Sequence, residues 1–272
     1  MALVLLAALL HASWNALIRS SADRGLDAAF VAGGAGVAAL AALPFLAAPA
    51  PASFGFLGAS GVIHVFYMLL VGAIYARGEM SVSYPLMRGS APLLTALGGA
   101  LLLGERMSAL GWAGVALTSG GVLGVAASAA RRGSAPTVLA FLNAAVIASY
   151  TLVDGAGARV SGSPVAYTLW TLLLSGAPVV ALAMRRRGEA FWRHLRSRWN
   201  KGLAGGAANA AAYALVLQAM TQAPVAAVAA LRESSIVFAM AISAFFLKER
   251  LTPARLAAAG AIACGAVLLR LA

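Results

Sequence analysis

Two arginines lie inside stretches of sequence that otherwise carry almost no charge. Arg88 is the one charged residue between positions 80 and 104, and Arg232 follows seven residues of alanine, valine and leucine. A guanidinium group holds five N–H donors in a planar fork, which suits a carboxylate or a phosphate, and it keeps its charge at physiological pH. These residues therefore favour the binding of an anion over acid–base or nucleophilic catalysis.

Residues that could carry catalysis or hold a metal are few and far apart. The chain has 8 acidic residues, three histidines (His11, His64 and His194) and one cysteine, Cys264. A single cysteine cannot form a disulfide within the chain. We therefore predict a protein that is not an enzyme and needs no metal or cofactor. No Walker sequence is present, so ATP-driven action is not expected.

The composition indicates the elements that must position the arginines. Of the 272 residues, 62% are hydrophobic and 10% are charged, whereas a soluble domain has about 45–50% apolar and about 25% charged residues. Such a chain has no soluble surface, and only helices or closed barrels satisfy the backbone in lipid. At about 20 residues per spanning helix, we predict an all-α integral membrane protein of ten transmembrane helices. They lie near 2–19, 28–48, 56–76, 80–103, 109–129, 136–158, 164–184, 202–221, 223–247 and 253–271.

The distribution of basic residues predicts the orientation. The loops after the first, third, fifth, seventh and ninth helices hold 15 of the 20 basic residues, whereas the other loops hold only Arg106 and Arg159. The positive-inside rule then places the odd loops in the cytoplasm and both termini outside. The first helix has neither a basic start nor a small-residue cleavage site, so we expect it to be retained rather than removed as a signal peptide.

The chain contains an internal repeat. A shift of 144 residues aligns 88–106 with 232–250, and six of the 19 positions are identical, including the arginine and a Glu-Arg pair at the helix end. We predict two five-helix units, 1–130 and 135–272. An odd number of spans inserts the two copies in opposite orientations, which is a plan of secondary transporters with a site near the midplane.

The same residues carry a resemblance to a family. Each predicted half closes its fourth helix with a Glu-Arg motif, Gly104–Ser108 and Lys248–Thr252, before a Gly/Ala-rich fifth helix. This pattern resembles the EamA-type transporters of the drug/metabolite transporter superfamily over essentially the whole chain. The resemblance implies a carrier with a central cavity lined by helices 1, 3, 4, 6, 8 and 9. In the triose-phosphate branch, basic residues on helices 4 and 9 hold phosphate, so the resemblance supports Arg88 and Arg232 as substrate-binding residues.

Ionisable residues at membrane depth cost at least about 2.5–3.5 kcal/mol and are functional candidates for that reason. Arg88 and Arg232 occupy equivalent places near the middle of helices 4 and 9. Instead of binding substrate, each could have a structural role, with its guanidinium group bonded to backbone carbonyls or to Glu233. Glu233 could balance Arg88 or carry a coupling proton, and Asp154 is the second coupling candidate. Pro85 and Pro92 are expected to kink helix 4 beside Arg88.

Polar side chains at helical spacing form stripes that suit a cavity wall, although each could equally be an interhelical hydrogen bond. The further substrate-binding candidates are His11, Trp14, Asn15, His64, Tyr67, Tyr84, Tyr150, Asn209 and Tyr213.

The most basic segment is 185–201. It spaces Phe191, Trp192, Leu195 and Trp199 along one helical face, which predicts either an interfacial helix on anionic headgroups or a plain cytoplasmic loop. Because its charge fits a membrane surface, no nucleic-acid partner is expected.

The expected function is secondary transport of a small organic metabolite across the inner or plasma membrane by alternating access, with possible proton coupling. The substrate would be anionic or zwitterionic, such as an amino acid, an organophosphate or a phosphonate. Two alternatives stay open: a broad-specificity drug or metabolite exporter, and a membrane enzyme acting on lipid-linked substrates.

Overall fold

The computed structural model describes residues 1–19, 23–77, 80–129, 137–246 and 252–272, and about 90% of these described residues are helical. The described residues contain no strand. Most of the second Glu-Arg motif, and the predicted boundary between the two halves, lie outside the described residues. The α-helices are α1 (Ala2–Arg19), α2 (Arg24–Ala42), α3 (Phe54–Arg77), α4 (Met80–Leu102), α5 (Ala109–Ala129), α6 (Thr137–Val160), α7 (Pro164–Arg187), α8 (Glu189–Met220), α9 (Val225–Arg232), α10 (Ser235–Phe246) and α11 (Pro253–Leu271).

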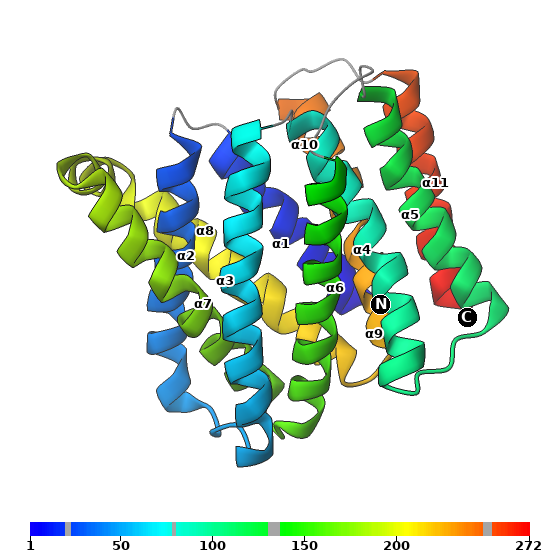
Figure 1. Cartoon of the computed structure of the whole chain (residues 1–272), viewed down its shortest axis with the longest axis horizontal. Helices are drawn as coiled ribbons and strands as arrows, with labels where there is room; N and C mark the ends of the chain where they lie inside the picture. The colour runs from blue at the N-terminus through cyan, green and yellow to red at the C-terminus, as the bar shows by residue number, and fades with distance from the viewer. Residues whose placement is uncertain (20–22, 78–79, 130–136, 247–251) are drawn as a thin grey trace.

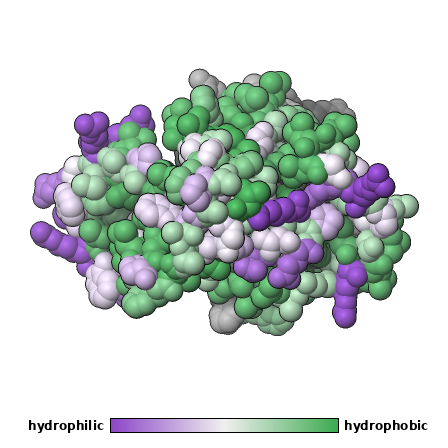
Figure 2. Space-filling model, turned by 90° about the horizontal axis from the view of Figure 1, so that it is seen from below, coloured by the Kyte–Doolittle hydropathy of each residue, from purple (hydrophilic) through white to green (hydrophobic). Residues whose placement is uncertain are grey.

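The helices stand side by side as an antiparallel bundle (Figure 1). Seven helical segments of the described chain are long and apolar enough to cross a membrane, and two shorter apolar helices occur in α1 and α5. The prediction of a multi-pass, all-α membrane protein is therefore confirmed. Seen from one end, the surface is largely hydrophobic, with hydrophilic side chains in small groups (Figure 2).

The structure corrects two predicted elements. The basic segment is neither a separate interfacial helix nor a loop: Gly188, with φ +49°, ends α7 and starts α8, which runs unbroken for 32 residues through the predicted eighth span. The ninth predicted span is interrupted after Arg232, where α9 ends; two residues, Glu233 and Ser234, separate it from the start of α10.

The interruption between α9 and α10 is built from short-range hydrogen bonds. The backbone N–H groups of Glu233 and Ser234 donate to carbonyls three residues earlier, at 3.0 and 3.1 Å, and the Ser234 hydroxyl donates to the Leu231 carbonyl. Such tightened turns inside a helix often mark hinges. In contrast, α4 continues as one helix through Pro85 and Pro92.

Glycines bring two pairs of helices into close contact. A Cβ atom at Gly34 of α2 would collide with the Gly202 carbonyl of α8, and one at Gly206 would collide with the backbone of α2. Gly114 and Gly265 similarly face each other between α5 and α11. Small residues are the usual means of close helix approach in membranes, where lipid gives no hydrophobic drive for association.

Candidate functional site

A cavity of about 210 Å³ lies between the helices. It extends from the level of Arg88 and Arg232 toward the end of the bundle where α1, α3 and α7 end. Nine of the eleven predicted substrate-binding residues line this cavity. They are Arg88, Arg232, His11, Trp14, His64, Tyr67, Tyr150, Asn209 and Tyr213.

The other two predicted residues do not line the cavity. The Asn15 amide donates to the His11 carbonyl of its own helix at 2.8 Å. Tyr84 packs against the apolar cluster that contains Ile74 and Met87. Both lie one turn from a lining residue, and helical spacing alone cannot tell which neighbour points inward.

Arg88 forms a buried ion pair with Glu233. Its Nε donates to Oε2 at 3.1 Å, between α4 and the α9–α10 turn. Its Nη2 lies 2.8 Å from Oε1, within ion-pair distance, but has no hydrogen-bond partner among the described residues. Arg88 is 8% exposed and Glu233 is 1% exposed. Of the two roles considered for Glu233, the geometry supports charge balance.

Arg232 lines the same cavity in a different environment. It is 8% exposed, and its buried Nε has no hydrogen-bond partner among the described residues. The indole Nε1 of Trp14, another lining residue, is also buried and without a partner in the described part of the chain. An unmet buried donor costs about 1–3 kcal/mol, so a bound acceptor would be favoured at both atoms.

Aromatic rings form one wall of the cavity. His64 stacks on Tyr150 with ring centroids 4.4 Å apart, and Tyr67 meets Tyr150 edge to face at 5.7 Å. The His64 Nδ1 lies 2.9 Å from the Ser60 carbonyl oxygen. Because a carbonyl can only accept, Nδ1 donates, and Nε2 is left as an acceptor in the neutral ring.

Asp154 lies next to the cavity, buried among α3, α6, α7 and α8. Its carboxylate accepts hydrogen bonds from the hydroxyls of Tyr167, at 3.2 Å, and of Tyr213, at 2.5 Å. Ser60 and His64 face it from α3. Tyr213 therefore connects the cavity to a buried acid, although Asp154 itself is not a lining residue.

The sequence analysis missed the parts of the wall that α2 and α7 supply. These are Ala32, Ala35, Leu172, Ser175, Gly176 and Val179. Only Ser175 among them is polar, and its hydroxyl donates to the Thr171 carbonyl of its own helix. Small apolar residues in an apolar helix give no signal that separates a cavity wall from a lipid-facing surface.

A second cavity, of about 360 Å³, lies nearer the opposite end of the bundle. Helices α1, α8 and α9 line both cavities, and the two linings meet within one turn on each: Ala7 and Val4, Val216 and Ala219, Arg232 and Leu231. All of these except Arg232 belong to one buried apolar cluster. A thin apolar layer therefore separates the two cavities.

The first Glu-Arg motif connects α4 to α6 and α9 at this end of the bundle. Gly104, with φ +65°, ends α4 in a glycine cap in which the Glu105 N–H donates to the Gly99 carbonyl. The turn directs the Glu105 carboxylate to the Val225 N–H at the start of α9, at 3.0 Å, and to Arg159 of α6. A carboxylate at a helix N-terminus meets both unpaired N–H groups and the positive end of the dipole. Arg159 also donates to the carbonyls of Met220 and Ala223.

The bundle of apolar helices defines a multi-pass membrane protein, and the cavity between its helices is a candidate binding site. The chain belongs to the EamA-like transporter family, whose sequence profile matches residues 135–271. A crystal structure of a protein with 22% sequence identity superposes with a TM-score of 0.76, over 99% of this chain and 95% of that one, which shows a shared fold. A comparison with curated protein sequences found no significant match.

Proposed function

We propose that this protein is a secondary carrier for a small organic anion or zwitterion, and that Arg232 binds the anionic group. The observation that carries the proposal is the difference between the two cavity arginines. Glu233 lies within ion-pair distance of Arg88, whereas the described residues place no acid within that distance of Arg232, whose buried Nε also has no hydrogen-bond partner there. A carboxylate, phosphate or phosphonate would accept charge-assisted hydrogen bonds from Arg232 and so give this N–H group an acceptor.

The helix contacts support a plan of two equivalent five-helix halves, 1–130 and 135–272. The contact of α1 with α8 has its counterpart in α3 with α6, and the contact of α2 with α8 has its counterpart in α3 with α7. The contacts of α1 with α9 and α10 likewise correspond to that of α4 with α6. The proposal treats α9 and α10 as one interrupted span, which gives ten spans in two inverted copies.

Alternating access then needs one end of the cavity closed at a time. The cavity lining reaches toward the ends of α1, α3 and α7 with Trp14, Met68 and Val179. The apolar layer and the Glu105 contacts lie at the other end. If the odd loops are cytoplasmic, as the basic residues predict, this is the state that is open to the cytoplasm. A reporter fused after Ala272 should then be active outside, and a cytoplasmic signal would contradict this orientation.

Asp154 is the better of the two coupling candidates. Glu233 is engaged by Arg88, whereas Asp154 is bonded through Tyr213 to the cavity wall. Protonation of Asp154 would give the carboxyl group one O–H donor, so one of the two tyrosine hydroxyls would have to accept a hydrogen bond instead of donating it. In this way, proton binding could be linked to the shape of the cavity.

The test is uptake by the purified full-length protein in proteoliposomes. Labelled amino acids, phosphonates and phosphorylated metabolites are compared with cationic drugs. We expect uptake of anions or zwitterions, stimulated by an imposed pH gradient, and loss of that stimulation in Asp154→Asn. Preference for a permanent cation would overturn the anion proposal in favour of a drug exporter. Persistence of pH-dependent uptake in the Asp154→Asn, Glu233→Gln double variant would overturn the coupling proposal.

A further inference from the structure

The end of α7 and the first 13 residues of α8 form a hairpin that projects beyond α2, at the left of Figure 1. Hydrophilic side chains also gather on that side of the bundle in Figure 2. The segment 185–201 contains seven basic residues other than histidine and a single acid, Glu189. Its charge is therefore far from balanced within the segment.

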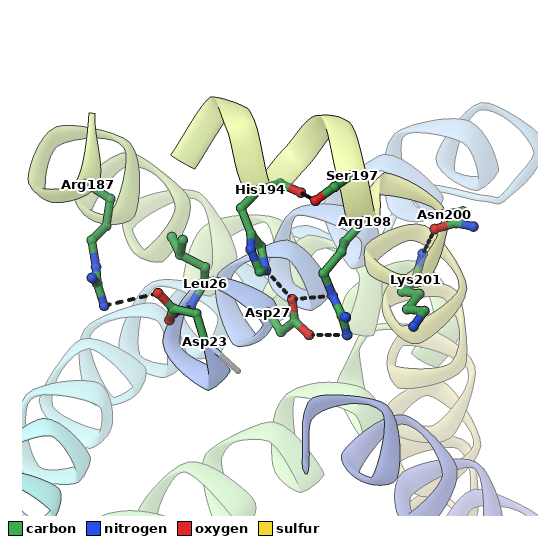
Figure 3. Close-up of polar contacts among 9 residues, drawn as sticks. All are labelled: Asp23, Leu26, Asp27, Arg187, His194, Ser197, Arg198, Asn200 and Lys201. Carbon is green, nitrogen blue, oxygen red and sulfur yellow. Dashed lines mark hydrogen bonds and ion pairs between the residues drawn. The ribbon is translucent and has the colours of Figure 1, made fainter. Parts of the chain in front are cut away.

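Part of this charge is used to attach the hairpin to α2. Asp27 lies 2.6 Å from the His194 Nε2 and accepts two hydrogen bonds from Arg198, at 3.2 and 2.8 Å, and Asp23 pairs with Arg187 (Figure 3). On the same side, Phe191 is buried against Phe30 with ring centroids 5.0 Å apart. This attachment fixes which side of α8 faces outward.

The remaining basic side chains are exposed, and the described residues place no acid within ion-pair distance of them. They are Arg185, Arg186, Arg193, Arg196 and Lys201. The outward side also carries Trp192 and Trp199, which are 49% and 59% exposed. Positions 192, 196 and 199 fall within about 60° of one another around the helix at 3.6 residues per turn. Arg196 therefore shares the face of the two indoles and lies between them along the helix axis.

The hairpin also contains the boundary between an apolar and a cationic surface. On α7, exposed Leu182 and Met184 are followed directly by the arginines, and on α8, exposed Trp199 and Lys201 precede exposed Leu203. Tryptophan is enriched at the level of lipid headgroups, where its ring is partly in lipid and its N–H meets polar groups. The change from apolar to cationic side chains places this part of the hairpin at that level.

We propose that the outward side of the hairpin, formed by Trp192, Arg193, Arg196 and Trp199, binds an anionic phospholipid. The arginines would contact the phosphate of the headgroup and the indoles would lie beside its glycerol and upper acyl chain. A nucleic acid or a soluble phosphate would use the arginines but would leave two large indoles exposed to water. The observation rests on the hairpin alone, so it stands or falls independently of the substrate proposed for the cavity.

Fluorescence quenching by brominated lipids tests the proposal on the full-length protein in nanodiscs. Phosphatidylcholine discs receive the same minority fraction of brominated phosphatidylglycerol or brominated phosphatidylcholine. The signal of Trp192 and Trp199 is obtained by subtracting that of the Trp192→Phe, Trp199→Phe variant. We expect stronger quenching by the anionic lipid, and an affinity about fivefold lower for each of Arg193→Gln and Arg196→Gln, because each cation near a membrane contributes about one such factor.

Two sets of variants separate the site from general effects. Arg193→Lys and Arg196→Lys keep the charge and should keep the preference, whereas Arg106→Gln and Arg270→Gln remove exposed arginines beside the second cavity and should leave it unchanged. Equal quenching by the two lipids would overturn the proposal. Displacement of the anionic lipid by inorganic phosphate or by an oligonucleotide would overturn it as well, because the surface would then not require a lipid.

Discussion

The two cavity arginines occupy equivalent sequence positions and yet have different partners. Arg88 lies in a continuous α4 and forms an ion pair with Glu233, whereas Arg232 ends the short α9 and keeps a buried Nε without a partner in the described residues. The residue after the arginine accounts for the difference. It is Gly89 in the first half and Glu233 in the second. One half therefore supplies the carboxylate that pairs with the arginine of the other half. We assign the second arginine to the proposed substrate.

The two halves also differ in how closely their helices approach at glycine residues. α2 and α8 meet through Gly34, Gly202 and Gly206 with no room for a Cβ atom, but Gly55 and Gly58 of α3 have no atom near the position of an added Cβ. Symmetry would make the crossing of α3 with α7 the counterpart of α2 with α8. The α2–α8 crossing is therefore packed more closely than α3 against α7, where a Cβ atom added at Gly61 would lie 3.8 Å from the Leu174 Cβ atom.

The largest expected effect concerns the ion pair. Arg88→Met leaves Glu233 buried without its partner, which should lower the free energy of unfolding by about 3–5 kcal/mol. Thermal or denaturant unfolding in detergent measures this loss. The double variant Arg88→Met, Glu233→Met should recover most of it, and Arg232→Met should be much less destabilised. Equal destabilisation by Arg88→Met and Arg232→Met would remove the distinction between the two arginines.

The next effect concerns binding. Arg232→Met should weaken affinity by about 10- to 150-fold, which corresponds to charge-assisted hydrogen bonds of about 1.5–3 kcal/mol. The probe is the carboxylate, phosphate or phosphonate that gives the largest thermal shift with the native protein, and titration calorimetry gives its affinity. Arg232→Lys should restore binding in part, because lysine lacks the planar fork. A folded Arg232→Met protein with native affinity would contradict the assignment.

The glycine crossing gives a smaller effect. Gly206→Ala should destabilise the protein by about 1–3 kcal/mol, because the added methyl group would collide with the α2 backbone and would force the two helices apart. Gly58→Ala adds the same methyl group where nothing lies within 4 Å and serves as the matched control. If the unfolding free energies of the two variants agree, the close packing of α2 and α8 contributes nothing specific.

The smallest effect concerns the closed end. Glu105→Gln removes a charge from the N-terminus of α9, where a carboxylate contributes about 0.3–1 kcal/mol. We expect the equilibrium constant between the two access states to change by up to about fivefold, toward the state that is open at that end. Labelling of a cysteine at position 213, in a Cys264→Ala background, with an impermeant thiol reagent applied from each side measures the shift. Glu189→Gln removes an exposed acid from the α7–α8 hairpin and should give no shift.

Several features of the protein could be predicted from its sequence because lipid imposes them locally. An apolar stretch of about 20 residues must be helical in lipid, so the existence of α1 to α7 and α11, and most of their ends, follows from composition. Nine of eleven predicted residues line the cavity, since a polar residue in an apolar helix has few other places to go. The choice between Asn15 and Trp14, one position apart, needed the packing of the helix.

Other features depended on contacts between residues far apart in the chain. The break after Arg232 has no proline or glycine beside it, and α8 runs unbroken although Gly202, Gly205 and Gly206 lie within it. Arg88, the partner of Glu233, lies 145 residues away in the sequence. The Val225 N–H group, which donates to Glu105, lies 120 residues away from it. Phe191 and Leu195, which share a helical face with two exposed tryptophans, pack on α2 instead of facing lipid.

The sequence by itself determined that this chain is a helical membrane protein and that two arginines lie within its apolar helices, because the cost of leaving backbone groups or charges unpaired in lipid is set residue by residue. Only the tertiary structure decided which arginine pairs with Glu233, which end of the cavity is closed and which side of α8 faces outward. Those outcomes depend on which carboxylate comes within hydrogen-bond distance of which cation, and that distance is set by the packing of all the helices together.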